Sequence, residues 1–214
     1  MPVLYRIGAP LGAVLGRCPV AVAGTRDPTP WGAHAAREVG RRLAEGGHTV
    51  VTGLARGVDE EAALGALEAG GRVVAVLPHL LEGGRPSPRA SWLLRVAARR
   101  NAPASAVAEN LVKDERYVRT WLAARNRIVA NMAAALVVPE ARFKLAHWGT
   151  RHAVEYALAA GRPVIVLKPQ AGDANVVKAF EYFMRRGAVA AEDIDEALGM
   201  AESACRAPHM FKNS

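Results

Sequence analysis

Short runs of apolar residues alternate with amphipathic stretches along most of the chain. The apolar runs are continuous rather than alternating, which is typical of strands covered on both faces: Val20–Ala23, Thr49–Thr52, Val73–Leu77, Ala104–Ala108, Leu136–Val138 and Val164–Leu167. The stretches between them space their apolar residues as helices do: Thr29–Glu45, Val58–Ala69, Ser91–Arg100, Glu115–Met132 and Thr150–Ala160. This alternation indicates an α/β fold, which we predict to be a doubly wound, mostly parallel sheet with helices on both faces.

The pattern changes after the last of these strands. From there the spacing is helical, over Asn175–Arg186 and Ile194–Ala201. We therefore predict a Rossmann-like core over residues 1–170 and a C-terminal helical extension over residues 171–214, which packs on the core and ends in a frayed tail. Within the core, Leu81–Pro88 is rich in glycine and proline, and we expect a loop there that forms a lid or an insertion.

The charge of the chain is positive and uneven. The 214 residues carry a formal net charge of +8. Residues 1–170 contain 23 Lys and Arg against 13 Asp and Glu, whereas residues 171–214 contain 5 against 7. A basic core favours a polyanionic partner, although an arginine-rich composition is also typical of GC-rich genomes and hot habitats. No apolar run is long enough to span a membrane, so we expect no membrane partner.

Cysteines, histidines and known catalytic motifs give little support for a metal site or for catalysis. Cys18 and Cys205 are far apart and have no neighbours at metal-ligand spacing, so we expect free thiols in a reducing compartment, the cytoplasm. His147 and His152 have no carboxylate at a useful spacing. The phosphate-loop, dinucleotide-binding and serine-hydrolase motifs are not matched. We therefore predict no metal, no cofactor and no catalytic residue.

Glycine-bearing turns follow three of the predicted strands. They are Gly24-Thr25-Arg26, the stretch Gly53–Gly57, and a loop that leads from Pro139-Glu140 to Gly149-Thr150. In an open parallel sheet these turns share the carboxyl edge, where ligands bind and where helix N-termini attract anions. Glycines alone are explained by tight corners between strand and helix. Tight corners do not explain why two of these turns carry an arginine, and these arginines favour an anion-binding site.

The order and spacing of these residues resemble the DNA-processing protein A (DprA/Smf) family. The matching stretches extend from about residue 20 to residue 167, and they are Gly24-Thr25-Arg26, Thr29–Gly32 (TPWG), Val51–Asp59 (VTGLARGVD), Arg125–Ala130 (RNRIVA), Val137–Glu140 (VVPE) and Trp148–Thr150 (WGT). Three of them are ordered motifs, which makes the resemblance fairly specific. We therefore identify the chain as resembling the Rossmann-like core of that family.

The chain also departs from the family pattern. Ala63 stands where the family usually has a histidine, and Trp148 replaces a serine. The residues after the third strand differ from the usual Gly-Leu-Asp and Tyr-Pro. Bacterial members often carry an N-terminal helical domain and a C-terminal winged-helix domain, for which 214 residues leave no room. We expect a divergent member that consists of the core.

The resemblance implies a protein that binds single-stranded DNA, assists DNA processing or recombination, helps to load a RecA-type recombinase, and forms a homodimer. With the turns described above, it places the phosphates at the carboxyl edge of the sheet. The predicted contact residues are Gly24, Thr25, Arg26, Gly53, Ala55, Arg56, Gly57, Arg125, Asn126, Arg127, Gly149 and Thr150.

Several side chains near this edge have open roles. Trp31 either stacks on a base or packs against the helix that follows it. One of Arg125 and Arg127 is expected to contact DNA, and the other to pair with a core carboxylate. The candidates for that carboxylate are Asp59 and Glu140, which we expect to support the site.

Two alternatives come from the same superfamily. A nucleoside-monophosphate phosphoribohydrolase would carry the signatures P-G-G-x-G-T-x-x-E and P-R-x-x-K, and neither is matched: the helix start reads Trp148-Gly149-Thr150, and Pro88-Arg89 is not followed by the lysine. A small-nucleotide sensor would use the same edge without a long basic track. We expect a binding protein rather than an enzyme.

Overall fold

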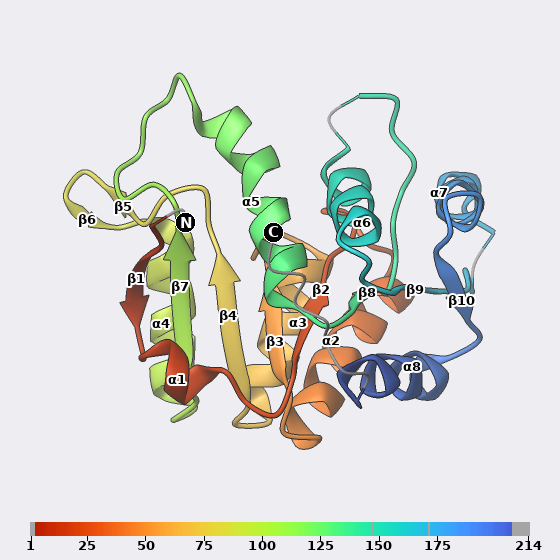
Figure 1. The fold of residues 1–214 in the computed structure, drawn as a ribbon, viewed down its shortest axis with the longest axis horizontal. Helices are drawn as coiled ribbons and strands as arrows, with labels where there is room; N and C mark the ends of the chain where they lie inside the picture. Colours follow the sequence, from red (N-terminus) through yellow and green to blue (C-terminus); the bar gives the residue numbers. More distant parts are fainter. Residues whose placement is uncertain (1–2, 147, 171, 207–214) are drawn as a thin grey trace.

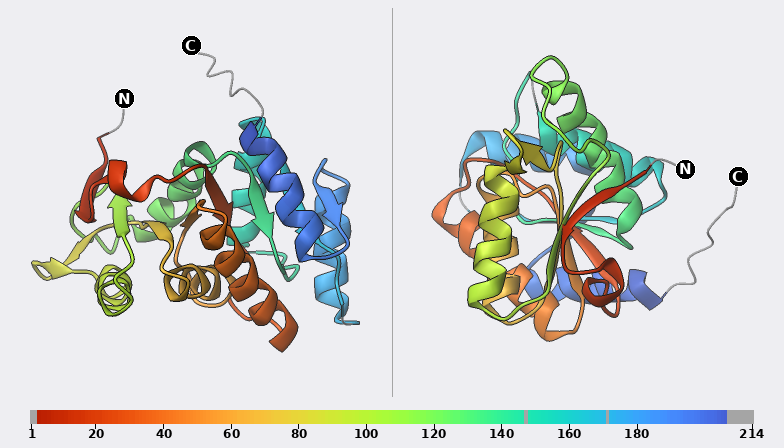
Figure 2. Two further views of the ribbon diagram at one scale, coloured as in Figure 1. Left: turned by 90° about the horizontal axis from the view of Figure 1, so that it is seen from below. Right: turned by 90° about the vertical axis from the view of Figure 1, so that its left-hand side faces the viewer.

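The computed structural model describes residues 3–146, 148–170 and 172–206, in which one eight-stranded sheet lies between two layers of helices (Figure 1, Figure 2). The strands of this sheet are β1 (Tyr5–Gly8), β2 (Pro19–Val22), β3 (Thr49–Thr52), β4 (Arg72–Val76), β7 (Ala104–Ala108), β8 (Leu136–Val138), β9 (Val164–Leu167) and β10 (Val189–Ala191). A separate two-stranded hairpin consists of β5 (Leu81–Glu82) and β6 (Arg85–Pro86).

The strand order reverses beside β2. The order is β1-β7-β4-β3-β2-β8-β9-β10, and β1 is antiparallel to β7 while the other neighbours are parallel. From β2 the chain builds outward to β3, β4 and β7, and then returns to β8 on the other side of β2. The switch point therefore lies between β2 and β8, where Val22 faces Val137. Ligands of open α/β sheets bind beyond the strand ends at this point.

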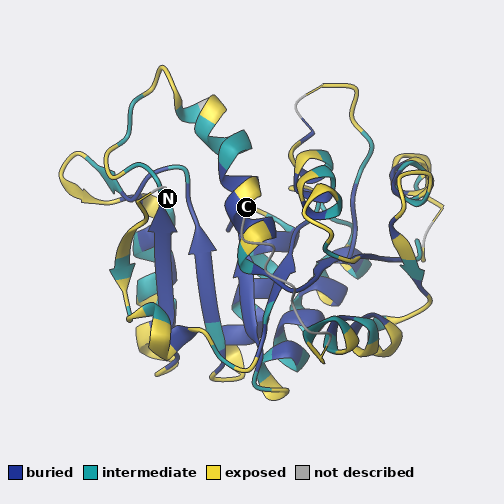
Figure 3. Cartoon of the chain, in the orientation of Figure 1, coloured by how far each residue is buried: buried dark blue, intermediate teal, exposed yellow. Residues whose placement is uncertain are grey.

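Helices cover both faces of the sheet, which confirms the predicted doubly wound α/β fold. One layer contains α2 (Pro30–Glu45), α3 (Val58–Glu68), α4 (Pro88–Arg99) and α8 (Ile194–Arg206). The other contains α1 (Leu11–Val14), α5 (Val118–Met132), α6 (Gly149–Ala159) and α7 (Ala174–Met184). Successive residues of β2 point into opposite layers, so Val20 and Val22 join one core and Ala21 joins the other. The central strands are accordingly buried along their length (Figure 3).

The outer parts of the sheet differ from the sequence prediction. The strand β1 is not among the predicted strands, and the stretch over Leu81–Pro88 forms the β5–β6 hairpin and the start of α4 rather than a plain loop. The extension after residue 170 is not solely helical, because β10 pairs with β9 in parallel. The sheet therefore continues into the extension. The helix α8 runs to Arg206, five residues beyond its predicted end at Ala201, so the first part of the expected frayed tail is helical. The rest of that tail, residues 207–214, lies outside the described residues.

The two cysteines form a disulfide, so the prediction of free thiols is wrong. Cys18 directly precedes β2, and Cys205 lies in the last turn of α8. Their Cα atoms are 5.9 Å apart although 187 residues separate them in the sequence. Packing of α8 in the same layer as α2 brings them together, which spacing in the sequence could not indicate.

The described helices give no sign of a membrane span. None of them is long and apolar enough to cross a bilayer.

Candidate functional site

A cavity of about 650 Å³ opens at the switch point of the sheet. The turn after β2, the helix α5 and the start of α6 form its walls. Residues that the sequence analysis marked line it, and they are Gly24, Thr25, Arg26, Ala55, Asp59, Arg125, Asn126, Gly149 and Thr150. The fold thus brings together motifs that are up to 126 residues apart, as the hydrogen bond from the Thr150 hydroxyl to the Gly24 carbonyl shows.

A second cavity of about 470 Å³ adjoins the first. It lies between the turn after β3, the β5–β6 hairpin and the start of α4, and two predicted contact residues that do not line the first cavity, Gly53 and Arg56, line it. Arg26, Ala55 and Arg125 line both cavities, so the two hollows meet at the turn after β2. Together they extend along the carboxyl edge from α6 to the hairpin.

The peptide groups of the turn after β2 are already bonded within the chain. The N–H of Gly24 donates to Asp59 Oδ1 at 3.2 Å, and the N–H of Thr25 donates to the carbonyl of Glu140 at 2.9 Å. The Gly24 carbonyl accepts the Thr150 hydroxyl at 2.8 Å. A Cβ on Gly24 would lie 2.5 Å from the Glu140 carbonyl oxygen. These two N–H groups are thus not free to contact a phosphate, and the glycine serves close packing.

A buried carboxylate and a buried guanidinium lie under this turn. Asp59 and Arg125 are 5% and 8% exposed. Asp59 accepts the N–H groups of Gly24 and Ala55, and Arg125 Nη1 donates to the Val76 carbonyl at 3.2 Å. Burial raises the pKa of the Asp59 carboxyl, while the charge of Arg125 and the two N–H groups oppose that rise. The pair joins α3 and α5 to the ends of three strands.

Room for the Arg125 guanidinium comes from Gly53. A Cβ at this position would lie 1.2 Å from Nη1 of Arg125. Any larger residue must therefore displace a buried cation that faces Asp59. The glycine of the second turn is explained by this contact, which no local pattern in the sequence could reveal.

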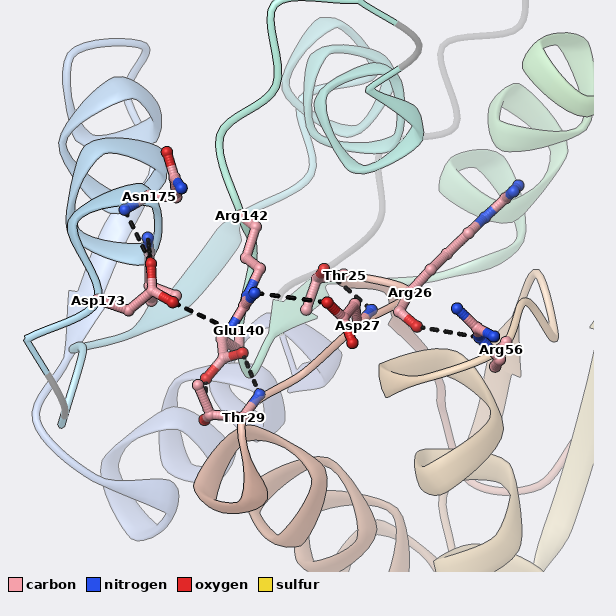
Figure 4. A network of polar contacts seen from close by, with 10 residues as sticks. Thr25, Arg26, Asp27, Thr29, Arg56, Glu140, Arg142, Asp173 and Asn175 are labelled. Atoms are coloured by element: carbon pink, nitrogen blue, oxygen red, sulfur yellow. Dashed lines mark hydrogen bonds and ion pairs between the residues drawn. The ribbon is translucent and has the colours of Figure 1, made fainter.

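Three cations along the two cavities are available to a ligand. Among the described residues that line them, the exposed side chains of Arg26, Arg56 and Lys144 form no ion pair. Figure 4 shows the Arg26 side chain extended, with its guanidinium far from the other labelled side chains. Arg56 Nε donates to the Arg26 carbonyl at 3.4 Å, which keeps the two residues side by side. These side chains supply positive charge that the chain itself does not neutralise.

Other cations at the edge are paired with carboxylates. Arg142 bridges Asp27 at 3.5 Å and Asp173 at 2.9 Å (Figure 4). In the second cavity, Arg89 pairs with Glu60 and Lys113 pairs with Glu82, both at 2.6 Å. These pairs offset part of the local charge, so the exposed positive charge that stays unpaired among the described residues along the two cavities is that of Arg26, Arg56 and Lys144.

The start of α6 faces the first cavity. Gly149 is exposed, and a Cβ there would meet nothing within 4 Å. No described side chain caps this helix end, so its positive dipole end points at the cavity. Asn126 Nδ2 donates to the Gly149 carbonyl at 3.3 Å, which fixes the helix start against α5.

An aromatic cluster anchors the residue before this helix start. Trp148 is buried, and its ring centroid lies 5.1 Å from that of Phe183, 5.0 Å from that of Tyr182 and 5.2 Å from that of Phe143. Phe183 and Tyr182 belong to α7. The tryptophan that replaces the family's serine thus packs the helix start of the site against the C-terminal extension.

Several marked residues lie outside both cavities. Arg127 is exposed and pairs with Glu109 at 3.0 Å, and Trp31 is partly buried and packs against the core under α2. Gly57 precedes α3 with a φ of +89°. Glu140 is buried and accepts the N–H of Thr29 at 2.8 Å and its hydroxyl at 2.5 Å (Figure 4). Of the two arginines in the RNRIVA motif, the structure therefore places Arg125 at the site.

The basic residues of the loop between β8 and α6 were not among the predicted contact residues. Arg142 and Lys144 line the first cavity together with His152, which was considered only as a metal ligand. His152 instead lies 3.9 Å from Glu155, and His147 lies outside the described residues. A signal was present, because the two cations follow a strand that ends at the carboxyl edge.

A comparison with known families matches this chain over residues 2–202 to DNA recombination-mediator protein A. The chain belongs to the DNA recombination-mediator protein A family. The matched stretch includes every residue that lines the two cavities. The resemblance read from the motifs is thereby confirmed.

Two curated relatives support this assignment. Protein Smf of Synechocystis sp. is 33% identical over 150 residues, which are 65% of this chain and 34% of that protein. A protein of Mycobacterium tuberculosis described as a DNA processing protein DprA is 32% identical over 201 residues, which are 92% of this chain and 49% of that protein. The chain thus spans about a third to a half of the length of these relatives.

Solved structures share the fold. DNA processing protein A of Helicobacter pylori, whose structure describes its single-stranded DNA binding mode, gives a TM-score of 0.74 at 24% identity and covers 94% of this chain and 86% of that one. DprA of Streptococcus pneumoniae gives 0.73 at 26% identity, over 92% of this chain and 66% of that one. The molybdenum cofactor carrier protein of Chlamydomonas reinhardtii gives 0.59 at 24% identity, over 87% and 97% of the two chains, so the fold is not confined to the family.

Proposed function

We propose that this chain binds single-stranded DNA along the carboxyl edge of its sheet. The observation that carries the proposal is the set of unpaired cations, Arg26, Arg56 and Lys144, along two adjoining cavities at the switch point. Guanidinium groups bind phosphate through forked hydrogen bonds, and an uncapped helix start adds a positive dipole end. Family membership and the DNA-binding mode described for the Helicobacter pylori relative support the same ligand.

The shape of the site favours single-stranded nucleic acid over a single nucleotide as the ligand. The two cavities meet at Arg26, so successive phosphates can follow the edge from the start of α6 toward the β5–β6 hairpin. The net charge of +8 attracts a polyanion at long range. Binding of this kind has weak sequence preference and falls steeply with salt.

The wider role that we propose is DNA processing or recombination in the cytoplasm. A homodimer and the loading of a RecA-type recombinase belong to the same proposal, and both rest on family membership alone. Size-exclusion chromatography with light scattering tests the dimer. Strand-exchange assays with and without the protein test the assistance to a recombinase.

We also propose that the site performs no phosphoribohydrolase chemistry. Of the carboxylates, Asp59 lines the first cavity, but it is buried and accepts two backbone N–H groups, and Glu140 is engaged by Thr29. Neither carboxylate is placed to act on a bound sugar. Ribose 5-phosphate released from AMP by the purified chain would contradict this reasoning.

The binding experiment compares four ligands over a salt series. Fluorescence anisotropy with labelled single-stranded DNA, duplex DNA and RNA, and competition by mononucleotides, rank the ligands directly. We expect single-stranded DNA to bind more tightly than duplex DNA, with mononucleotides as weak competitors. Tighter binding of a mononucleotide than of the oligonucleotide would favour the nucleotide sensor and would contradict the proposal.

A further inference from the structure

Three potential metal ligands lie together at the amino end of the sheet, opposite the proposed DNA site. Cys18 precedes β2, His48 precedes β3, and Cys205 lies in the last turn of α8. The two sulfurs and a ring nitrogen of His48 all lie within 4.8 Å of one another. In Figure 1 the helix α8 lies near the lower end of the sheet, away from the loops at the top. The cluster therefore has no part in the site described above.

The histidine of this cluster has no hydrogen-bond partner among the described residues. His48 is 3% exposed, and neither ring nitrogen forms a hydrogen bond. A buried polar group without a partner costs free energy, and a bound metal ion would remove that cost. Burial lowers the pKa of His48, while Glu202 acts in the opposite direction and Arg17 adds to the lowering.

We propose that Cys18, His48 and Cys205 bind a zinc ion when their disulfide is reduced, and that the disulfide is the metal-free, oxidised state of the same site. Two thiolates and an imidazole are ligands that zinc prefers, in tetrahedral geometry. Glu202 Oε1 lies 3.9 Å from His48 Nε2, and this residue is one helical turn before Cys205. Its carboxylate is the nearest group for the fourth position.

The backbone positions of Cys18 and Cys205 are compatible with both the disulfide and the zinc-bound state. Zinc–sulfur bonds of about 2.3 Å at tetrahedral angles place two sulfurs about 3.8 Å apart. The Cα atoms of Cys18 and Cys205 are 5.9 Å apart, so rotation of the two side chains can separate the sulfurs without moving β2 or α8.

The exchange between the states is a two-electron reaction. A dithiol reductant gives two electrons to the Cys18–Cys205 bond, each sulfur takes a proton, and the reductant becomes a disulfide. Zinc then binds both sulfurs and releases the two thiol protons. Hydrogen peroxide reverses the change: the two sulfurs lose two electrons and join, zinc leaves, and the peroxide takes up two protons and becomes two waters. Both the disulfide and the zinc state fasten α8 to the sheet.

The test uses the full chain, reduced with a dithiol and then freed of reductant and metal. Two free thiols should be counted, and cobalt(II) added as a probe should bind at one equivalent with an intense thiolate-to-cobalt absorption band. Zinc should displace the cobalt and should slow the alkylation of both cysteines. The oxidised chain should give no such band.

Variants distinguish a specific metal site from nonspecific metal binding. Cys205→Ser should abolish one-equivalent binding, and His48→Gln should weaken cobalt binding by at least about tenfold, because even groups that only orient ligands contribute that much. His34→Gln, which changes an exposed histidine of α2, should leave cobalt binding unchanged.

Any of three results would overturn the proposal. They are a reduced chain, folded by circular dichroism, that gives no thiolate-to-cobalt band; a disulfide that resists dithiols in the folded chain; and unchanged cobalt affinity in folded His48→Gln. If that variant does not fold, the alkylation of the unaltered chain decides, because cysteines that react equally fast with and without zinc contradict a site.

Discussion

Replacing Arg26 by alanine should weaken the binding of single-stranded DNA without weakening the fold. Its side chain is exposed and forms no ion pair among the described residues, so the truncation leaves no charge unpaired. Each phosphate neutralised on a single strand contributes about 0.7 to the slope of log K against log salt. Loss of one contact should therefore flatten the slope by about 0.7 and lower affinity about fivefold at 0.1 M salt, or about 1 kcal/mol.

Anisotropy titrations of a labelled oligonucleotide at several salt concentrations measure this slope. Arg99→Ala is the matched control, because it removes the same charge from an exposed, unpaired position at the end of α4 that lines neither cavity. Lys144→Ala should behave like Arg26→Ala. Arg127→Ala should have little effect, because Glu109 already holds that side chain. Equal losses for Arg26→Ala and Arg99→Ala would contradict a specific contact at Arg26, since net charge alone would then explain binding.

Three further predictions concern the scaffold of the site. Gly53→Ala should displace the Arg125 guanidinium from its place near Asp59 and lower the free energy of unfolding by about 3 kcal/mol in urea titrations; an unchanged value would show that Arg125 is free to move. Thr29→Ala should cost about 1–2 kcal/mol in thermal unfolding, because it removes the cap of α2, whereas Thr29→Ser should cost little. Burial lowers the pKa of His79, so the unfolded chain binds more protons and stability should fall as the pH drops from about 7 to about 5. His79→Gln should flatten that dependence, and an unchanged pH profile would contradict it.

The centre of the sheet could be predicted from the sequence because its strands are buried on both faces. The bounds of β3, β7, β8 and β9 agree with the predicted ranges. Each is a short, mostly apolar run that is buried along its whole length, and such runs identify buried parallel strands. The two layers of helices could be predicted because amphipathic stretches alternate with these apolar runs along the chain.

The edges of the sheet could not be predicted in this way. Three of the four residues of β1 are exposed, and β10 has one exposed residue and one half-buried residue among its three. An edge strand with an exposed face carries little apolar pattern, so pairing with a neighbour decides its structure. For this reason the sequence predicted only helices after residue 170, although that part of the chain contributes the strand β10.

The candidate site was predictable in its location but not in its contacts. The corner at Gly24–Arg26 follows from the strand that precedes it. Its N–H partner is Asp59, 35 residues later, and this bond is visible only in the folded chain. The same holds for the contact of Gly53 with Arg125 and for the disulfide between residues 187 positions apart. Local sequence indicates where a strand ends, whereas the partners of its turn depend on the packing of distant elements.

Photo-crosslinking with peptide mapping shows directly which edge of the sheet single-stranded DNA contacts. A single-stranded oligonucleotide with photoreactive bases is bound at low salt, irradiated and digested, and the attached peptides are identified. We expect crosslinks in the peptide that contains Arg26 and in the loop that contains Lys144, both at the carboxyl edge. Crosslinks confined to the amino end of the sheet, around Cys18 and α8, would contradict it.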